Sequence, residues 1–374
     1  MIRFREMMCK FFTYMLNKLQ TFDGETSQDA SPSKVLCNYG SSPHVNQEQT
    51  TNTFSETSSE ASQEVAGDTR SEIIRKEEKS DSEVFDFIRT STCVNSEESV
   101  ILGASLRGRS HKDSATDCQD FHLYANIANG WNVFVVSDGA GSAKFAGRGS
   151  KANCSIFVKL LSDMFTKNQW DKAVSLPSEL DWHMEFRSIC ERMKLLFAEK
   201  AKEECVEETD FNATLIVCIL TPYGMLCGHI GDGRMGYQSS NGEWKSLMIP
   251  HKGEEANQTL FLQNPWVAPR VPTLKVCGVY VPETRVVNEL PKTLVLMSDG
   301  CERSAWECSI YDSNLARYID VNKPHPGFMD PLVDSIVNEK DEERLQLFID
   351  IMDKGTKTCE QERDDKTMLM AILK

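Results

Sequence analysis

The feature that most constrains this fold is an Asp-Gly pair that recurs directly after apolar, strand-like segments. Asp138-Gly139, Asp232-Gly233 and Asp299-Gly300 follow the segments VFVVS, LCGHIG and TLVLMS. Asp-Gly is also a common tight-turn signal, as at Asp23-Gly24, which follows no apolar segment. Because the same arrangement repeats, we expect these strand ends to meet at one rim of a sheet rather than to form separate turns.

Further acids stand directly before two other strand-like segments. Asp120 precedes FHLYANIA, and Asp364-Asp365 precedes KTMLMAIL. Carboxylates gathered at one rim repel one another, and their pKa values rise unless a cation neutralises them. Oxygen-only ligands select hard cations such as Mg²⁺ or Mn²⁺. Two such ions about 3.5–4 Å apart can share one carboxylate and hold a hydroxide that attacks phosphorus in line. The acids therefore predict a paired-metal site for phosphoester chemistry.

Strand-like segments joined by short turns make up most of the chain after residue 97. Short turns between consecutive strands favour antiparallel pairing. The helices come in pairs rather than one after each strand, which favours an α+β fold over a doubly wound α/β sheet. The expected strands are 99–108, 121–128, 131–139, 213–221, 224–231, 233–238, 293–300 and 366–374, and the expected helices are 143–167, 183–204 and stretches within 329–354.

Composition divides the chain into three parts. Residues 1–20 place apolar side chains at helical spacing among Arg and Lys, which predicts an amphipathic helix. A membrane-surface helix, a partner-binding helix, a loosely ordered terminal helix and a mitochondrial presequence all stay open for this segment. Residues 21–95 are rich in Ser, Thr, Gln and Glu and bury too little apolar surface to offset chain entropy, so a disordered tether is expected. Residues 96–374 form the predicted globular domain.

Charge and cysteine usage exclude several function classes. The formal net charge of -15 repels phosphate backbones, so no nucleic-acid partner is expected. The 13 cysteines include no C-x-x-C pair, which argues against a zinc site and for reduced thiols in a cytoplasmic location. No apolar stretch approaches the roughly 20 residues that a membrane span needs.

The ordered set of motifs over residues 99–374 resembles the metal-dependent type 2C serine/threonine protein phosphatases, and most closely their bacterial-type branch. Each motif alone is weakly specific, whereas their order is specific. The resemblance implies two central antiparallel sheets flanked by helix pairs, a four-layer α-β-β-α sandwich, and a phosphatase domain over residues 96–374. The matching segments are GASLRGRSHKDSATDCQD, VVSDGAGSAKFAGRGS, ATLIVCIL with GHIGDGRMG, LVLMSDGCERS and DDKTMLMAIL.

The resemblance also implies a set of metal ligands. Asp138 would bridge two Mn²⁺ or Mg²⁺ ions, and Gly139 would offer its carbonyl to one of them. Asp299 and Asp364 would bind the second ion. Asp232 corresponds to a ligand of a weaker third ion.

Three further residues match the family's catalytic positions. Asp120 would orient a metal-bound water, while Arg109 and His111 lie where the family keeps a phosphate-binding cation. Many animal members carry a histidine directly after the first Asp-Gly as a candidate general acid, but here that residue is Ala140. His111 is then the nearest candidate proton donor by motif position. The alternatives are that His111 only binds the phosphate, or that a metal-bound water serves as the acid.

Other departures affect the metal sites. The acid expected just before Asp120 is Gln119. The acid that often completes the third site is Arg303, with Glu302 beside it.

The function that follows is a protein serine/threonine phosphatase acting by direct attack of a metal-bridging hydroxide. Its partners would be a phosphorylated protein and a cognate kinase. An inactive pseudophosphatase that serves as a binding module is the alternative, and the retained Asp138, Asp299 and Asp364 argue against it. A covalent aspartyl mechanism would want an acid where Ala140 stands.

Overall fold

The structure is a computed structural model that describes residues 91–128, 130–251, 259–263, 275–276, 279–280, 282–308, 310–314 and 316–374. The predicted helix at 1–20, and the predicted tether up to residue 90, lie outside the described residues. In the part of the chain that is described, no helix is both long and apolar enough to cross a bilayer.

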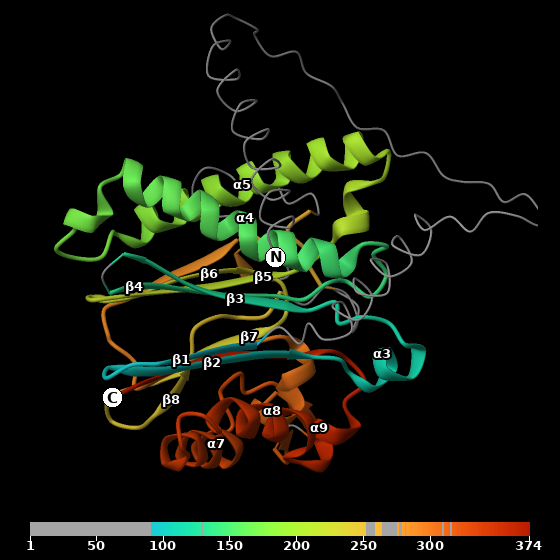
Figure 1. Cartoon of the computed structure of the whole chain (residues 1–374), viewed down its shortest axis with the longest axis vertical. Helices are drawn as coiled ribbons and strands as arrows, with labels where there is room; N and C mark the ends of the chain where they lie inside the picture. Colours follow the sequence, from blue (N-terminus) through green and yellow to red (C-terminus); the bar gives the residue numbers. More distant parts are fainter. Residues whose placement is uncertain are drawn as a thin grey trace, which may run out of the picture. The chain divides into compact units, whose positions relative to one another are not determined.

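Two antiparallel sheets form the centre of the domain (Figure 1). The first sheet has six strands, in the order β1-β2-β15-β12-β7-β8. The second has five, in the order β11-β6-β5-β4-β3. The strands of the first sheet are β1 (Ser91–Asn95), β2 (Ser99–Leu106), β15 (Lys366–Leu373), β12 (Thr293–Met297), β7 (Arg234–Gln238) and β8 (Trp244–Ser246). Those of the second are β11 (Glu283–Val287), β6 (Gly224–Ile230), β5 (Leu215–Thr221), β4 (Trp131–Ser137) and β3 (Phe121–Ala128).

Helices cover the outer face of each sheet (Figure 1). The long helices α4 (Ala146–Lys167) and α5 (Glu179–Glu204) cover the second sheet, and α7 (Pro326–Asn338), α8 (Arg344–Lys354) and α9 (Lys357–Gln361) cover the first. The expected α+β sandwich is therefore confirmed. Short elements complete the chain: α3 (Arg109–Ser114), α6 (Glu302–Ala305), η1 (Trp170–Lys172), η2 (Glu208–Phe211), η3 (Asp299–Cys301), and the strand pairs β9 (Lys275–Val276) with β10 (Val279–Tyr280) and β13 (Ile310–Asp312) with β14 (Arg317–Ile319).

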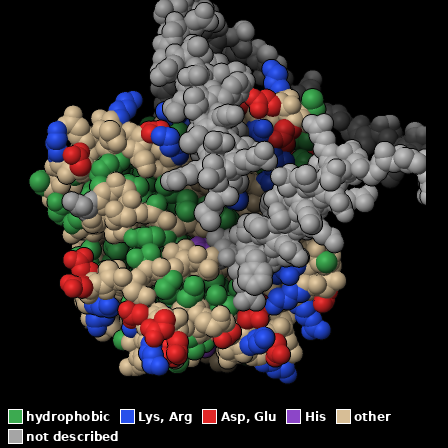
Figure 2. Space-filling model, viewed as in Figure 1, with side chains coloured by type: hydrophobic (Ala, Val, Ile, Leu, Met, Phe, Trp, Pro, Cys, Tyr) green, Lys and Arg blue, Asp and Glu red, His purple; other side chains and the backbone are tan. Residues whose placement is uncertain are grey.

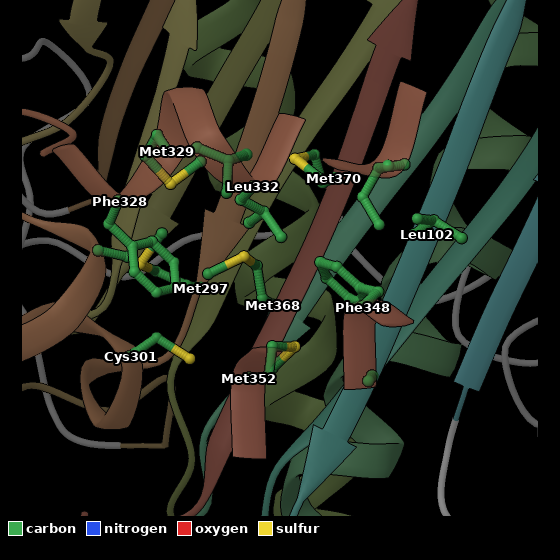
Figure 3. Close-up of a cluster of buried hydrophobic side chains, with 14 of the residues drawn as sticks. Leu102, Met297, Cys301, Phe328, Met329, Leu332, Phe348, Met352, Met368 and Met370 are labelled. Carbon is green, nitrogen blue, oxygen red and sulfur yellow. The ribbon is translucent and has the colours of Figure 1, made fainter. Parts of the chain in front are cut away.

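Alternate side chains of the central strands fill two separate cores. Along β12, Leu294 and Leu296 belong to the core between the sheets, whereas Val295 and Met297 belong to the core under α7 and α8. Figure 3 shows this second core, where Met297, Met368 and Met370 meet Phe328 and Phe348. A strand that is buried on both faces reads as an unbroken apolar run, which is why TLVLM was recognisable in the sequence.

The surface follows the same layering. On the face seen in Figure 2, charged side chains lie mainly over the outer helices, and the band between them is mostly apolar or uncharged. The two layers that carry most of the charge are thus the ones with one face in solvent.

Strand β1 corrects the predicted boundary between the tether and the domain. Its five residues were assigned to the tether, but they pair with β2 from Ser91↔Ala104 to Asn95↔Val100. This edge strand is largely exposed and holds few apolar residues, so its pairing rests on backbone hydrogen bonds that hydrophobic patterning does not reveal. The domain begins no later than Ser91, and the rest of the predicted division stays a prediction.

Candidate active site

Strand register brings the predicted acids to one end of both sheets. In the second sheet, Ser137 of β4 pairs with Phe121 of β3, so Asp138 and Asp120 extend side by side beyond the paired residues. In the first sheet, Met297 of β12 pairs with Arg234 of β7, which sets Asp299 opposite Asp232 in the same way.

The start of β15 completes this end of the first sheet. Met297 also pairs with Met368, so the chain before β15 runs past Asp299 and places Asp364 near it. The backbone N–H of Ser298 donates to the carbonyl of Thr367 over 3.0 Å and keeps the two chains together up to this point. The sequence prediction that these acids share one rim agrees with the positions observed.

Burial and mutual repulsion raise the pKa values of the clustered carboxyls. Burial is the largest cause for Asp138, followed by the negative charges of Asp120, Asp299 and Asp364. Burial, then the charge of Asp232, likewise raises the pKa of Asp299 well above its usual value. The charges of Asp120, Asp232 and Asp364 raise the pKa of both Asp138 and Asp299, so the aspartates form one electrostatic cluster.

Asp120 connects the two sheets. Its carboxyl is buried, and burial together with the charge of Asp365 raises its pKa to about 7. Ser298 Oγ donates a hydrogen bond of 2.7 Å to Asp120 Oδ2, and the same Oγ accepts the backbone N–H of Thr367 over 3.0 Å. Ser298 therefore joins β12 and β15 of one sheet to the start of β3 in the other.

Thr214 fixes the backbone around Asp138. The N–H of Asp138 donates to Thr214 Oγ1 over 2.9 Å, and the N–H of Thr214 donates to the carbonyl of Asp138 over 2.8 Å. The sequence analysis gave no role to Thr214 or Ser298. A hydroxyl one residue before a strand, or directly after one, is too common a feature to single out in a sequence.

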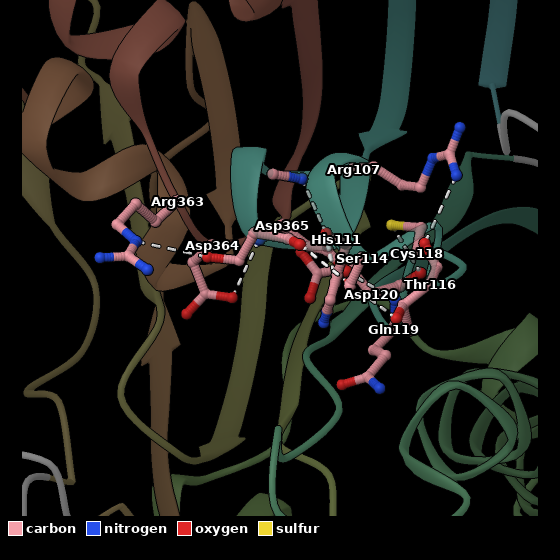
Figure 4. A network of polar contacts seen from close by, with 12 residues as sticks. Arg107, His111, Ser114, Thr116, Cys118, Gln119, Asp120, Arg363, Asp364 and Asp365 are labelled. Atoms are coloured by element: carbon pink, nitrogen blue, oxygen red, sulfur yellow. Dashed lines mark hydrogen bonds and ion pairs between the residues drawn. The ribbon is translucent and has the colours of Figure 1, made fainter.

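Asp365 is a third residue for which the sequence predicted no role. Its side chain is only 1% exposed. Its Oδ1 accepts the backbone N–H of Gly108 over 2.8 Å, and its Oδ2 accepts that of Gln119 over 2.6 Å. His111 Nδ1 also lies 2.8 Å from Oδ1 (Figure 4). One carboxylate thus ties the whole loop from Gly108 to Gln119 to the start of β15.

The two predicted cationic residues have different surroundings. His111 is 19% exposed and contacts Asp365, and its charge acts on Asp364. Arg109 has a side chain that is 64% exposed and lies 3.9 Å from Asp113 on its own helix. The structure therefore brings His111 to the acid cluster, while the contacts seen for Arg109 keep it on the outside of α3.

The position where the family often has an acid for the third metal ion also differs from the family pattern. Glu302 binds Arg234, with 2.7 Å between Oε2 and Nη2, and Arg234 is completely buried. Asp320 binds the same guanidinium at 2.8 Å. Glu302 is thus engaged in a structural ion pair, and Arg303 is 71% exposed. Asp232 remains in the cluster, and the charge of Glu302 also raises the pKa of Asp299.

The carboxylate oxygens of the cluster are suitable ligands for divalent cations. Every charge that raises the pKa of Asp138 comes from another carboxylate. Oδ1 of Asp299 is buried and has no hydrogen-bond partner among the described residues. A buried carboxylate oxygen without a donor is costly, and hard cations bind through oxygen ligands of this type. Asp138 and Asp299 are therefore suited to Mg²⁺ or Mn²⁺.

A second group of potential ligands lies elsewhere and is already hydrogen-bonded. The side chains of His229, His251 and Glu283 come within 4.8 Å of one another. However, His229 Nε2 lies 3.0 Å from the carbonyl of Ile249, and His251 Nδ1 accepts the N–H of Gly231 over 3.2 Å. These contacts connect His229 and His251 to the backbone on either side of Asp232.

Glycines after the acids allow close approach of the backbone. A Cβ at Gly300 would lie 1.9 Å from the carbonyl oxygen of Asp365, and one at Gly139 would lie 2.6 Å from that of Ala146. Both glycines thus leave room for neighbouring backbone, and this lets the strand ends bring their acids together.

Gly300→Ala is therefore expected to destabilise the domain by roughly 1–3 kcal/mol, since the clash is with backbone that cannot rotate away. Urea unfolding in EDTA measures this effect. Gly141→Ala is the matched control, because a Cβ there meets nothing within 4 Å, and its effect should stay within about 0.5 kcal/mol. Equal stabilities of the two variants would contradict the close-approach explanation.

The two sheets, the helix pairs and the acid cluster define a phosphatase fold of a known class. A family model described as protein phosphatase 2C matches residues 107–350. The chain belongs to the protein phosphatase 2C family. No curated protein sequence matches it significantly.

Several solved structures are similar to this chain at low sequence identity. The serine-threonine phosphatase 2C from Toxoplasma gondii is 14% identical, with a TM-score of 0.46, over 75% of this chain and 97% of that one. The Mycobacterium tuberculosis serine/threonine phosphatase PstP/Ppp is 13% identical, with a TM-score of 0.44, over 74% and 99%. RsbX in complex with magnesium is 14% identical, with a TM-score of 0.42, over 76% and 100%.

Proposed function

We propose that this chain is a metal-dependent protein phosphatase that hydrolyses phosphoserine and phosphothreonine. The observation that carries the proposal is the cluster of buried carboxyls with raised pKa values, in which Asp299 Oδ1 has no donor among the described residues. Membership of the protein phosphatase 2C family supports the same chemistry.

Each acid of the cluster has a proposed task. Asp138 would hold both ions of a Mn²⁺ or Mg²⁺ pair, the backbone carbonyl of Gly139 would bind one of them, and Asp299 and Asp364 would hold the second. Asp232 would contribute to a weaker third site. When bound, the ions supply a nucleophile at neutral pH and neutralise phosphate charge. Asp120, kept in place by Ser298, would orient the attacking water by accepting its hydrogen bond.

The leaving group needs a proton, and Ala140 cannot supply one. A serine alkoxide is a poor leaving group unless it is protonated, so a positioned acid is worth about 10²–10⁴-fold in rate. Among the predicted residues, His111 lies beside the acid cluster and carries exchangeable protons. We assign it the role of proton donor, whereas phosphate binding by Arg109 stays a prediction from the sequence, since its contact with Asp113 keeps it on the outside of α3.

The substrate class follows from the family and the charge of the chain. A phosphorylated protein is the proposed substrate, made by a cognate kinase. The net charge of -15 argues against nucleic acid. A cytoplasmic location, and contact of residues 1–20 with a membrane surface, stay predictions from the sequence.

Phosphate release from a phosphoserine peptide tests the proposal. The full chain should release phosphate with Mn²⁺ or Mg²⁺, and an excess of EDTA should stop the release. Readdition of Mn²⁺ should restore it. If the folded, Mn²⁺-loaded chain releases no phosphate from peptide or aryl substrates, the alternative of an inactive binding module holds instead.

A further inference from the structure

Asp365 has a pattern of contacts that loop anchoring alone does not require. Two backbone N–H groups, from Gly108 and Gln119, already occupy its oxygens. His111 nevertheless brings Nδ1 to within 2.8 Å of Oδ1. Figure 4 shows His111 next to Asp365. A buried carboxylate that accepts a hydrogen bond from one ring nitrogen fixes a histidine's tautomer and orientation, and Asp365 lies within reach of that role.

The contact is a close ion-pair contact rather than an aligned hydrogen bond. The two atoms are 2.8 Å apart, but the ring is turned so that Nδ1 does not direct a hydrogen bond at the oxygen. Hydrogen bonds of catalytic groups are commonly misaligned before substrate binds and align in the complex. The distance between Nδ1 and Oδ1 is already that of a hydrogen bond, so alignment changes the angle and not the separation.

We propose that Asp365 is a positioning residue that holds Nδ1 of His111 and so directs Nε2 toward the leaving-group oxygen of the substrate. This inference rests on the proposed phosphatase function. With the Nδ1 proton shared with Asp365, the opposite nitrogen is the one that serves the substrate. Asp365 and His111 together supply the leaving-group proton that Ala140 cannot supply.

The proton-transfer step balances without any further reagent. Water forms a P–O bond as the P–O bond to serine Oγ breaks, and the bonding electron pair stays on Oγ. Nε2 of His111 gives its proton to Oγ, so serine leaves as an alcohol. The proton released by the attacking water returns to the solvent and then to His111, and the products are serine and inorganic phosphate.

Two substrates and two variants test the proposal. The nitrophenolate of a nitrophenyl phosphate leaves without being protonated, whereas the serine of a phosphoserine peptide must be protonated to leave. His111→Ala and Asp365→Asn should each slow the peptide reaction at least about tenfold more than the nitrophenyl reaction. In the His111→Ala background, Asp365→Asn should add little to this difference, because the ring that it positions is gone.

Asp353→Asn is the matched control. Asp353 anchors the same short helix α3 through Lys112, at 2.7 Å, but it does not contact His111 in the structure. This variant should change the rates on both substrates by the same factor. A loss of activity caused only by a looser helix α3 would match the Asp353→Asn result. The ratio of the rates on the two substrates therefore separates positioning of His111 from anchoring of the helix.

A measurement on the wild-type chain does not depend on how the variants fold. Nitrogen NMR of ¹⁵N-histidine protein in EDTA should show His111 with a protonated Nδ1, with the signal assigned by its loss in His111→Ala. A His111 with an unprotonated Nδ1 overturns the proposal. Equal losses on both substrates in Asp365→Asn, or a full effect that persists without His111, also overturn it. Failure of the phosphatase assignment is distinct, since the wild type would then release no phosphate from either substrate.

Discussion

Asp138→Asn is expected to lower phosphate release by roughly 10³-fold or more while the fold is retained. Asp138 is the residue through which both ions of the proposed pair would be held, so the change removes the shared ligand rather than one of several. An amide also lacks the charge that draws cations to the cluster. The measurement is the rate on a phosphoserine peptide at saturating Mn²⁺, with calorimetry of Mn²⁺ binding beside it.

The same variant carries an internal control for folding. Burial and four neighbouring carboxylates raise the pKa of Asp138, so its negative charge is unfavourable in the metal-free domain. An asparagine removes that repulsion, and the metal-free variant should be at least as stable as the wild type. Asp163→Asn, at a half-exposed acid on α4, should leave activity unchanged. Full activity of Asp138→Asn would refute the paired-metal site.

The parts of the site that the sequence predicted are those that local pattern encodes. Asp138 and Asp299 follow strands buried on both faces, so an unbroken apolar run marks the residues before them. The run ends where the sheet ends, and an acid at that place must lie at a rim. The convergence of the acids could thus be inferred before the register was known.

The parts that the sequence did not predict depend on contacts between distant segments. The bond from Ser298 to Asp120 spans 178 positions, and that from Gln119 to Asp365 spans 246. Neither residue type is unusual where it stands. Glu302 is a similar case, since only the structure shows that Arg234 engages it.

Removal of metal should make the stability of the domain fall as pH rises from about 4 to about 7. The carboxyl of Asp120 has an ordinary pKa of 3.8 when unfolded, and burial with the charge of Asp365 raises it to about 7 in the fold. Between these values the folded chain binds more protons than the unfolded chain, so each increase in pH favours unfolding. The loss at neutral pH is on the order of a few kcal/mol.

Thermal unfolding in EDTA and in Mn²⁺ over this pH range measures the effect. In EDTA, the midpoint should fall by roughly 5–10 °C between about pH 5 and about pH 7.5. In Mn²⁺, the slope should vanish or reverse, because the metal binds the ionised carboxylates and its affinity increases as they lose their protons. Asp120→Asn in EDTA is the control, and its midpoint should fall less steeply than that of the wild type. The same pH dependence with and without Mn²⁺ would show that the cluster does not bind the metal, since repulsion among its carboxylates is relieved only by a cation or by protons.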